Sequence, residues 1–263
     1  MKLGELGNYD QNYVDQQAPK IKRLVHKWFR AVVSGLELVP EGAFLGVGNH
    51  SGGTLMPDTF VWTSEYHTSK KPTPLLTLSH ASIFDVYPKR LVRSLARMGA
   101  IRAAPKLALN ALQDGYAVQV YPGGDYDACR KFSQRNQIVF AGQQGYAKLA
   151  KLAGVPIVPI VSIGGHESLC VLWDGAPLAK ALKLDKRYGL KTFPLSLCLP
   201  WGLWLGPLPG YLPLPTQITV KVLPPIEPVG DIDKIDQAVR FAMQNCLDEL
   251  ASSRHYLGIN QGW

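Results

Sequence analysis

Cysteine is scarce in this sequence of 263 residues, and the few thiols stand apart from one another. The four, at positions 129, 170, 198 and 246, form no Cys-x-x-Cys pair and no zinc-like spacing with histidine, which argues against a structural zinc site. Their surroundings are mostly apolar, as is typical of buried thiols in a reducing compartment. The sequence also lacks a Gly-x-Ser-x-Gly elbow, so a covalent serine mechanism has no support.

Segments for export or membrane crossing are missing as well. Residues 1–17 are polar and lack the apolar centre of a secretory signal peptide, so we expect the protein to work in the cytoplasm. Residues 192–215 carry no charge over about the length that crosses a bilayer. Prolines in that stretch would break a helix and leave backbone groups that lipid cannot satisfy; they stand at positions 194, 200, 207, 209, 213 and 215. We therefore expect a buried or interfacial loop there.

Charge of one sign dominates the polar residues that are present. Lysine and arginine number 28 against 20 acidic residues, which gives a formal charge of +8. Such an excess favours a negatively charged partner: nucleic acid, anionic lipid or a phosphorylated small molecule. Nucleic acid is the weakest of these, because the aromatic residues follow core periodicity and do not interleave with a basic stripe. We expect no nucleic-acid partner.

The segment from residue 19 to 38 has the periodicity of an amphipathic helix. Apolar residues stand at positions 21, 24, 25, 28, 29, 32 and 33, and basic ones at 20, 22, 23, 26, 27 and 30. Such a helix suits an anionic membrane surface, and the same pattern fits a helix docked on the protein's own core. We interpret residues 1–38 as an N-terminal amphipathic membrane-interface helix and residues 39–263 as the catalytic domain. The protein is then expected on the cytoplasmic side of a membrane, as a peripheral or monotopic protein.

Short apolar runs alternate with helical segments along the rest of the chain. Strands are expected at 43–47, 75–78, 117–121, 156–162 and 218–222, and helices from residue 57, at 106–113, at 142–152 and at 231–252. Glycine-containing loops follow several of these strands, which predicts an active site at the strand ends. The pattern predicts an α/β fold with a central mixed, mostly parallel sheet flanked by helices, and an N-terminal amphipathic helix.

His50 is the leading candidate for a catalytic group. It lies in a glycine-rich loop after the first core strand, and Asp58 follows at the start of a helix. An imidazole titrates near neutral pH, and a carboxylate beside it fixes the tautomer and stabilises the imidazolium. A lone loop histidine is more often a structural hydrogen-bonding group. The neighbouring glycines and the acid favour a general base that activates an incoming hydroxyl.

Four segments in order give the sequence a resemblance to the glycerolipid acyltransferase superfamily. They are Asn49-His50 with Asp58, Met98-Gly99-Ala100-Ile101-Arg102, Tyr121-Pro122-Gly123-Gly124, and Val155-Pro156-Ile157-Val158-Pro159. The superfamily carries a His with an Asp five positions later, then Gly…Arg, Phe-Pro-Glu-Gly and Val-Pro-Ile-Val-Pro blocks. The ordered set, over about residues 44–170, is much more specific than any one block.

Two departures narrow the resemblance. Asp58 comes eight residues after His50, so its carboxylate must reach back over a longer loop. Gly123 stands where the enzymes with phosphorylated acceptors have glutamate. The Pro-Gly-Gly run, the later Asp127 and the turn with Glu167 are similar to the branch that includes the type 2 diacylglycerol acyltransferases.

The resemblance implies acyl-CoA as co-substrate, with no other cofactor, and we expect no bound metal. It leaves the acceptor open between a neutral lipid alcohol, such as a mono- or diacylglycerol, and a lysophospholipid such as lysophosphatidate; the missing glutamate favours the neutral alcohol. Glycine N–H groups would meet the charge on the thioester oxygen, and Arg102 would bind a phosphate of donor or acceptor. Beside catalytic His50 and Asp58, the residues expected to bind substrate are Arg102, Tyr121, Pro122, Gly123, Gly124, Asp125, Asp127, Arg130 and Glu167.

Other classes of function compete with this interpretation. The glycines at 46, 48 and 52 are a loose relative of the dinucleotide-binding fingerprint, but the spacing is one residue too long. A metal-dependent hydrolase would use His50, Asp58, Asp125 and His166, although no ligand spacing supports it. A non-catalytic lipid-binding module is the remaining alternative.

Overall fold

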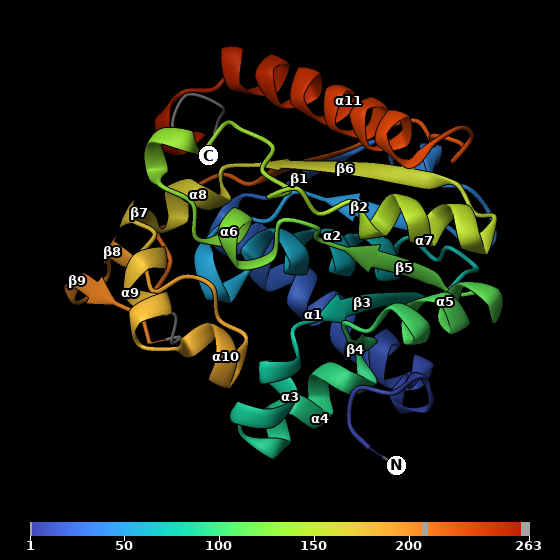
Figure 1. Ribbon diagram of the computed structural model, residues 1–263, viewed down its shortest axis with the longest axis horizontal. Coiled ribbons are helices and arrows are strands. Elements are labelled where there is room, and N and C mark those ends of the chain that lie inside the picture. The colour runs from blue at the N-terminus through green and yellow to red at the C-terminus, as the bar shows by residue number, and fades with distance from the viewer. Residues whose placement is uncertain (1, 207–209, 259–263) are drawn as a thin grey trace.

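The computed structural model describes residues 2–206 and 210–258 of the chain. Its centre is a seven-stranded sheet in the order β1-β10-β6-β2-β5-β3-β4, in which β10 is antiparallel to β6 and the other neighbours are parallel (Figure 1). The strands are β1 (Val32–Ser34), β2 (Leu45–Gly48), β3 (Leu75–Ser79), β4 (Ala100–Arg102), β5 (Ala117–Val120), β6 (Ile157–Ile163) and β10 (Thr219–Val222). The expected α/β class with a mixed, mostly parallel sheet is confirmed.

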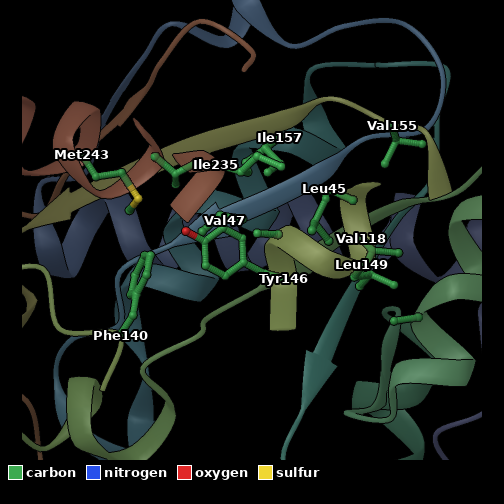
Figure 2. Close-up of a cluster of buried hydrophobic side chains, with 14 of the residues drawn as sticks. Leu45, Val47, Val118, Phe140, Tyr146, Leu149, Val155, Ile157, Ile235 and Met243 are labelled. Atoms are coloured by element: carbon green, nitrogen blue, oxygen red, sulfur yellow. The ribbon is translucent and has the colours of Figure 1, made fainter. Parts of the chain in front are cut away.

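Helices cover both faces of this sheet. Leu45, Tyr146 and Met243 belong to the core on the face covered by α5 (Pro105–Gln113), α7 (Gly145–Ala153) and α11 (Ile232–Ser252) (Figure 2). Phe29 and Trp62 belong to the core on the other face, beneath α1 (Gln11–Phe29) and α2 (Pro57–Thr68). The shorter helices are α3 (Ala81–Val86), α4 (Lys89–Arg97), α6 (Gly124–Ala128), α8 (Gly165–Ser168), α9 (Ala176–Ala181) and α10 (Leu184–Tyr188). Because β2 and β6 are covered on both faces, all of their residues are buried.

The N-terminal helix α1 differs from its expected bounds. It begins after Asp10, whose side chain caps the first turn, and it ends at Phe29. Residues 32–34 form β1 instead, because the Val32 N–H donates to the Ile218 carbonyl and β-branched residues favour a strand. The expectation of one helix reaching residue 38 is therefore wrong.

The apolar face of α1 is turned toward the protein's own core. Val14, Ala18, Val25 and Phe29 are buried, and α1 packs along α2. On α1, Lys22 forms an ion pair of 2.6 Å with Glu65 of α2. The sequence left two interpretations of this helix, contact with a membrane and docking on the protein's own core. The buried side chains of α1 are docked on the core. The functional division of the chain at residue 38 and the membrane location stay predictions.

A second, three-stranded sheet lies at one side of the molecule, beside α9 and α10 (Figure 1). Its antiparallel strands are β7 (Cys170–Trp173), β8 (Leu195–Cys198) and β9 (Gly202–Leu205). The expected loop at 192–215 is thus partly a hairpin, because Pro194 and Pro200 stand outside the paired strands and remove none of their hydrogen bonds. Pro207 and Pro209 lie outside the described residues. Among the described helices, none combines the length and the apolar character needed to cross a bilayer.

Candidate active site

Three loops meet where β6, β2 and β5 end. Because β2 lies between the other two strands and runs parallel to both, their loops emerge at one edge of the sheet. His50 follows β2, Tyr121 follows β5 and His166 follows β6. Asn49 braces this edge, since its Nδ2 donates to the Ser162 carbonyl at 2.9 Å and its Oδ1 accepts the Ser162 N–H at 2.8 Å. The loop that carries His50 is therefore tied to the neighbouring strand.

His50 and Asp58 form a buried pair. Nδ1 of His50 lies 3.2 Å from Oδ2 of Asp58, and the side chains are only 8% and 1% exposed. The same oxygen accepts the Ser51 N–H at 3.0 Å, which fixes the orientation of the carboxylate. Asp58 lies in the first turn of α2, where the helix dipole stabilises a negative charge. With Nδ1 held by the acid, Nε2 is the nitrogen left for proton transfer.

A compact turn closes the longer spacing between these two residues. Gly52 and Gly53 adopt left-handed φ angles of +80° and +67°, and Gly53–Leu55 forms one 3₁₀ turn. Pro57 then starts α2, where its fixed φ suits the first helical position. The extra residues fold back on themselves, so the acid meets the imidazole despite its departure from the superfamily spacing.

The aromatic ring of Tyr121 stacks on the His50 imidazole. The ring centroids lie 4.3 Å apart and the ring planes are inclined by 20°. A Cβ at Gly48 would lie 2.6 Å from Cε1 of Tyr121, so glycine at that position leaves space for the ring. Burial, with the nearby Asp58 charge, raises the pKa of the Tyr121 hydroxyl well above its ordinary value. Tyr121 was expected to bind substrate, and its observed contact is with the candidate base.

Asp127 and Arg130 form a buried ion pair beside the histidine loop. Their side chains are 0% and 2% exposed, and Asp127 also accepts the backbone N–H of His50. Arg130 donates a further hydrogen bond to the Arg135 carbonyl at 3.1 Å. Burial lowers the pKa of the Arg130 guanidinium to about 9, so the group stays charged at neutral pH. The contacts that the structure shows for these two residues are with each other and with the loop that carries the base, and their expected binding of substrate stays a prediction.

The turn after β5 is tightly packed. The Gly124 N–H donates to the Tyr121 carbonyl at 3.1 Å, so it is not available to a substrate oxygen. A Cβ at Gly123 would lie 2.1 Å from the Val139 carbonyl oxygen, so this glycine permits a close approach of two backbone segments. The substrate role expected of Gly124 stays a prediction that does not use this N–H. The roles expected of Pro122 and of the Gly123 N–H stay predictions.

Asp125 lies on the partly exposed side of α6. Its carboxylate accepts the Lys191 N–H at 3.1 Å, which joins α6 to the segment before β8. The Lys191 ammonium lies over the Tyr126 ring, 5.6 Å from its centroid. Asp125 thus links the central fold to the second sheet, and its contact with substrate stays a prediction.

Glu167 fastens the C-terminal segment. Arg254 binds its carboxylate through two hydrogen bonds of 2.8 and 2.9 Å. The Thr216 hydroxyl and the Leu257 N–H donate to the same group at 3.2 and 2.7 Å. Four donors thus occupy this buried carboxylate, and its expected contact with substrate stays a prediction.

Arg102 lies away from the His50 cluster. It ends the edge strand β4, which is three strand positions from β2, or about 14 Å at the usual strand spacing. Its guanidinium binds Asp85 through two hydrogen bonds of 2.8 and 3.2 Å and the Leu3 carbonyl at 3.2 Å. The carbon at the centre of the guanidinium lies 4.8 Å from the centre of the Phe84 ring. Arg102 therefore does not join the acid and base expected beside it.

An apolar groove of about 370 Å³ lies along α1 and the start of α2. Its wall comes from α1, from the start of α2 and from the segment after β9. The lining residues are Ile21, Leu24, Val25, Trp28, Phe29, Leu55, Pro57, Phe60, Leu212 and Pro213. Trp28 closes one side by donating its Nε1–H to the Pro213 carbonyl at 3.0 Å. One lining residue, Pro57, directly precedes Asp58 in the chain.

Sequence reasoning missed several residues that build this site. Asn49 and Ser162 had a readable signal, since each is a polar residue at the end of an apolar strand. Arg254 gave no such signal, because it meets Glu167 across 87 residues of chain. The groove was equally hidden, because Trp28 and Pro213 are 185 residues apart.

Two histidines, the partly buried His67 and the buried His166, make the stability of the protein depend on pH. Burial lowers the pKa of His67 to about 4, and burial with the charges of Arg130 and His50 lowers the pKa of His166 well below its ordinary value. Below about pH 6.5 the unfolded chain binds protons at these positions and the folded chain does not, so stability falls as the pH falls. We expect a loss of up to about 1.4 kcal/mol per pH unit for each histidine. Urea unfolding between pH 6.5 and 5.5 measures this slope.

The His67→Gln variant provides the comparison, because His67 stands outside the acid–base cluster. The free energy of unfolding of this variant should fall less steeply with falling pH than that of the unmodified protein, by up to about 1.4 kcal/mol per pH unit. Equal slopes for the two proteins would show that His67 is protonated in the folded state.

Comparison with known proteins adds evidence from outside the chain. The sequence profile described as diacylglycerol acyltransferase matches residues 7–250. An uncharacterized protein of Mycobacterium tuberculosis is 27% identical over 248 residues, which cover 90% of this chain and 66% of the relative. A Mycobacterium leprae protein, also uncharacterized, is 26% identical over 252 residues and 64% of its own length. The chain thus spans just under two thirds of the length of these relatives.

Two further comparisons come from better described proteins. A mouse protein named as a DGAT1/2-independent enzyme synthesizing storage lipids is 26% identical over 174 residues, which are 65% of this chain and 51% of the mouse protein. The crystal structure of the 1-acyl-sn-glycerophosphate acyltransferase PlsC from Thermotoga maritima has the same fold, with a TM-score of 0.58 and 17% identity. The match covers 93% of this chain and 82% of that one. With a family match over residues 7–250, the chain belongs to the diacylglycerol acyltransferase family.

Proposed function

We propose that this protein is an acyltransferase that moves a fatty acyl group from acyl-CoA to the hydroxyl of a neutral lipid alcohol, such as a mono- or diacylglycerol. His50 acts as the general base in this proposal. The observation that carries it is the buried His50–Asp58 pair; an apolar groove lined by Pro57, the residue before Asp58, offers space for an acyl chain. Acyl transfer to a lipid alcohol requires a base, a group that orients the base, and apolar space for the chains.

The proposed step needs no covalent intermediate with the protein. The acceptor hydroxyl gives its proton to Nε2 of His50 while its oxygen attacks the thioester carbonyl carbon. Asp58 accepts the Nδ1–H hydrogen bond, which keeps the required tautomer and stabilises the imidazolium. The tetrahedral intermediate then collapses, the C–S bond breaks, and the coenzyme A sulfur takes the proton from His50. One ester and one free thiol form.

The position of Arg102 favours a neutral acceptor. In lysophosphatidate the phosphate is only a few bonds from the hydroxyl that is acylated, so a phosphate-binding group must lie close to the base. Arg102 is about 14 Å away along the sheet and is bound to Asp85. A phosphate of coenzyme A, at the far end of the pantetheine arm, suits that distance better.

Lysophosphatidate is the second candidate acceptor. Its support is the fold shared with the Thermotoga maritima enzyme, whose name states that substrate, together with the net positive charge of this chain. The missing glutamate at Gly123 and the distance of Arg102 weigh against it.

A product assay distinguishes the two acceptors. Purified protein is incubated with radiolabelled acyl-CoA and equal amounts of monoacylglycerol, diacylglycerol and lysophosphatidate, and the labelled esters are separated. Label in the neutral glycerides supports the proposal, whereas label only in phosphatidate would overturn it.

Charge reversal at Arg102 shows which substrate that residue binds. We expect Arg102→Glu to lower the use of every acceptor alike, because the arginine would contact the donor. The control Arg90→Glu lies on the exposed side of α4 and should leave all rates near those of the unmodified protein. A selective loss with lysophosphatidate would assign Arg102 to the acceptor.

The groove predicts the acyl chain preference. Leu24 lies at its rim with 65% exposure, so Leu24→Trp should narrow the groove without disturbing the core. We expect kcat/KM for long-chain relative to short-chain acyl-CoA to fall by about tenfold, because lost methylene contacts are worth about 0.8 kcal/mol each. Leu152→Trp, at an exposed position on α7, is the matched control. An unchanged chain-length ratio in Leu24→Trp would show that the transferred chain binds elsewhere.

A further inference from the structure

The sheet β7-β8-β9 presents apolar side chains to solvent. Directly opposed residues of antiparallel strands share a face, and the register sets Leu197 opposite Leu203 and Leu195 opposite Leu205. Leu197, Leu203 and Leu205 are 43%, 60% and 55% exposed. Leu172 on β7 and the turn residues Leu199 and Trp201 are exposed as well. We call the exposed leucines the leucine face; its members are Leu172, Leu197, Leu199, Leu203 and Leu205. The Trp201 ring stacks on Trp204 of the opposite side, with centroids 6.2 Å apart, and is not a member.

The opposite side of this sheet already has its own core. Leu169, Val171, Cys198 and Tyr211 are buried there, with Trp204 packed against them. An antiparallel sheet with one buried face normally carries polar residues on the other. The leucine face breaks that pattern, and contiguous exposed apolar patches mark interaction sites.

The chain beside the leucine face indicates what covers it. The segment 174–191, which connects β7 to β8, contains five basic and two acidic residues. All five basic side chains are exposed: Lys180, Lys183, Lys186, Arg187 and Lys191. An apolar surface beside a basic segment (Figure 1) complements an anionic lipid bilayer, with leucine below the headgroups and lysine among them.

The same surface continues into the apolar groove. Leu212 donates its N–H to the Leu199 carbonyl at 2.8 Å and also lines the groove beside Leu55 and Pro57. Tyr211, one residue before it, donates its hydroxyl hydrogen to the Gly52 carbonyl at 3.3 Å. The leucine face is thus joined through two adjacent residues to the groove and to the loop that carries His50.

We infer that the leucine face inserts into the surface of an anionic lipid bilayer and that the basic segment 174–191 binds its headgroups. This inference rests on the proposed function in one respect, that the substrate is a lipid. It adds the β-hairpin as a membrane contact to the expected N-terminal helix, part of whose apolar face is buried against the protein's core. Leu212 then lies between the bilayer contact and the apolar groove.

Vesicle sedimentation tests the inference. The full chain is mixed with vesicles of phosphatidylcholine alone and with vesicles that also contain phosphatidylglycerol. The triple variant Leu197→Ser, Leu203→Ser, Leu205→Ser should lower partitioning onto the anionic vesicles by at least roughly tenfold. It lacks three large apolar side chains whose transfer from water into the bilayer would favour binding. The control combines Leu152→Ser with Phe241→Ser, two exposed positions on α7 and α11, and should bind as the unmodified protein does.

A second variant tests the basic segment without touching the sheet. The double variant Lys183→Glu, Lys186→Glu should bind phosphatidylglycerol vesicles less tightly. Added salt should likewise reduce the binding of the unmodified protein to these vesicles. Unchanged binding of the triple serine variant would overturn the inference. So would an unmodified protein that ignores vesicles and forms dimers that the triple serine variant does not form, since the face would then join two copies of the chain.

Activity on water-soluble, short-chain substrates separates this inference from the proposed function. The triple serine variant should keep that activity and no longer bind the anionic vesicles. A protein that binds vesicles through the leucine face but transfers no acyl group would refute the proposed function and leave the membrane surface standing.

Discussion

Replacing His50 with alanine is expected to lower the rate of acyl transfer by about 10²–10⁴-fold, the usual contribution of a general base. The fold should persist, because the contact of His50 with Asp127 uses the backbone N–H, and the Ser51 N–H still orients Asp58. Initial rates of thiol release and the thermal unfolding midpoint measure the two effects separately.

Asp58→Asn and His255→Ala complete this experiment. The asparagine variant places an amide where the imidazole requires a carboxylate, so kcat should fall while KM changes little. His255 is exposed and lies outside the cluster, so its alanine variant should retain full activity. Near-normal turnover in His50→Ala would show that another group removes the proton.

The second large effect is expected at Asp127, as a loss of stability. Asp127→Ala leaves the Arg130 guanidinium charged and buried without its partner, which typically costs about 3–5 kcal/mol. Turnover should fall as well, because the His50 N–H loses its acceptor. Urea unfolding gives the free energy, and the rate of thiol release gives the activity.

Two comparisons make that result specific to the buried charge. Arg130→Met combined with Asp127→Ala should recover much of the lost stability, because no buried charge remains. Glu249→Ala removes one partner of the exposed Lys221–Glu249 pair and should cost no more than about 1 kcal/mol. If Asp127→Ala costs as little as Glu249→Ala, the buried pair is not the support of the histidine loop.

Five of the seven strands of the central sheet were predicted, because the middle of the sheet is buried; its two edge strands, β1 and β4, were not. Continuous apolar runs such as residues 156–162 have few alternatives to a core strand, and their glycine-containing ends indicated the active-site edge. The bounds of α1 were less readable, because its apolar spacing continues into Val32 and Val33. Pairing with β10, which lies far along the chain, decides that those two valines form a strand.

The residues of the candidate site also differ in how far local sequence revealed their role. His50 and Asp58 were identified from local chemistry, and the structure brings them together. Asp127 and Glu167 were expected to bind substrate, and a carboxylate beside a glycine turn has the same sequence appearance in a structural role. Their structural partners could not be read from the sequence, since Arg254 reaches Glu167 only after the chain has folded.

The most direct test of this account measures ester and free thiol together. Purified protein is supplied with acyl-CoA and diacylglycerol, and the two products are quantified over time for the unmodified chain and for His50→Ala. The account predicts one thiol released for each triacylglycerol formed, and almost none of either in the variant. Equal ester formation by the two proteins, or thiol release without any ester, would contradict it.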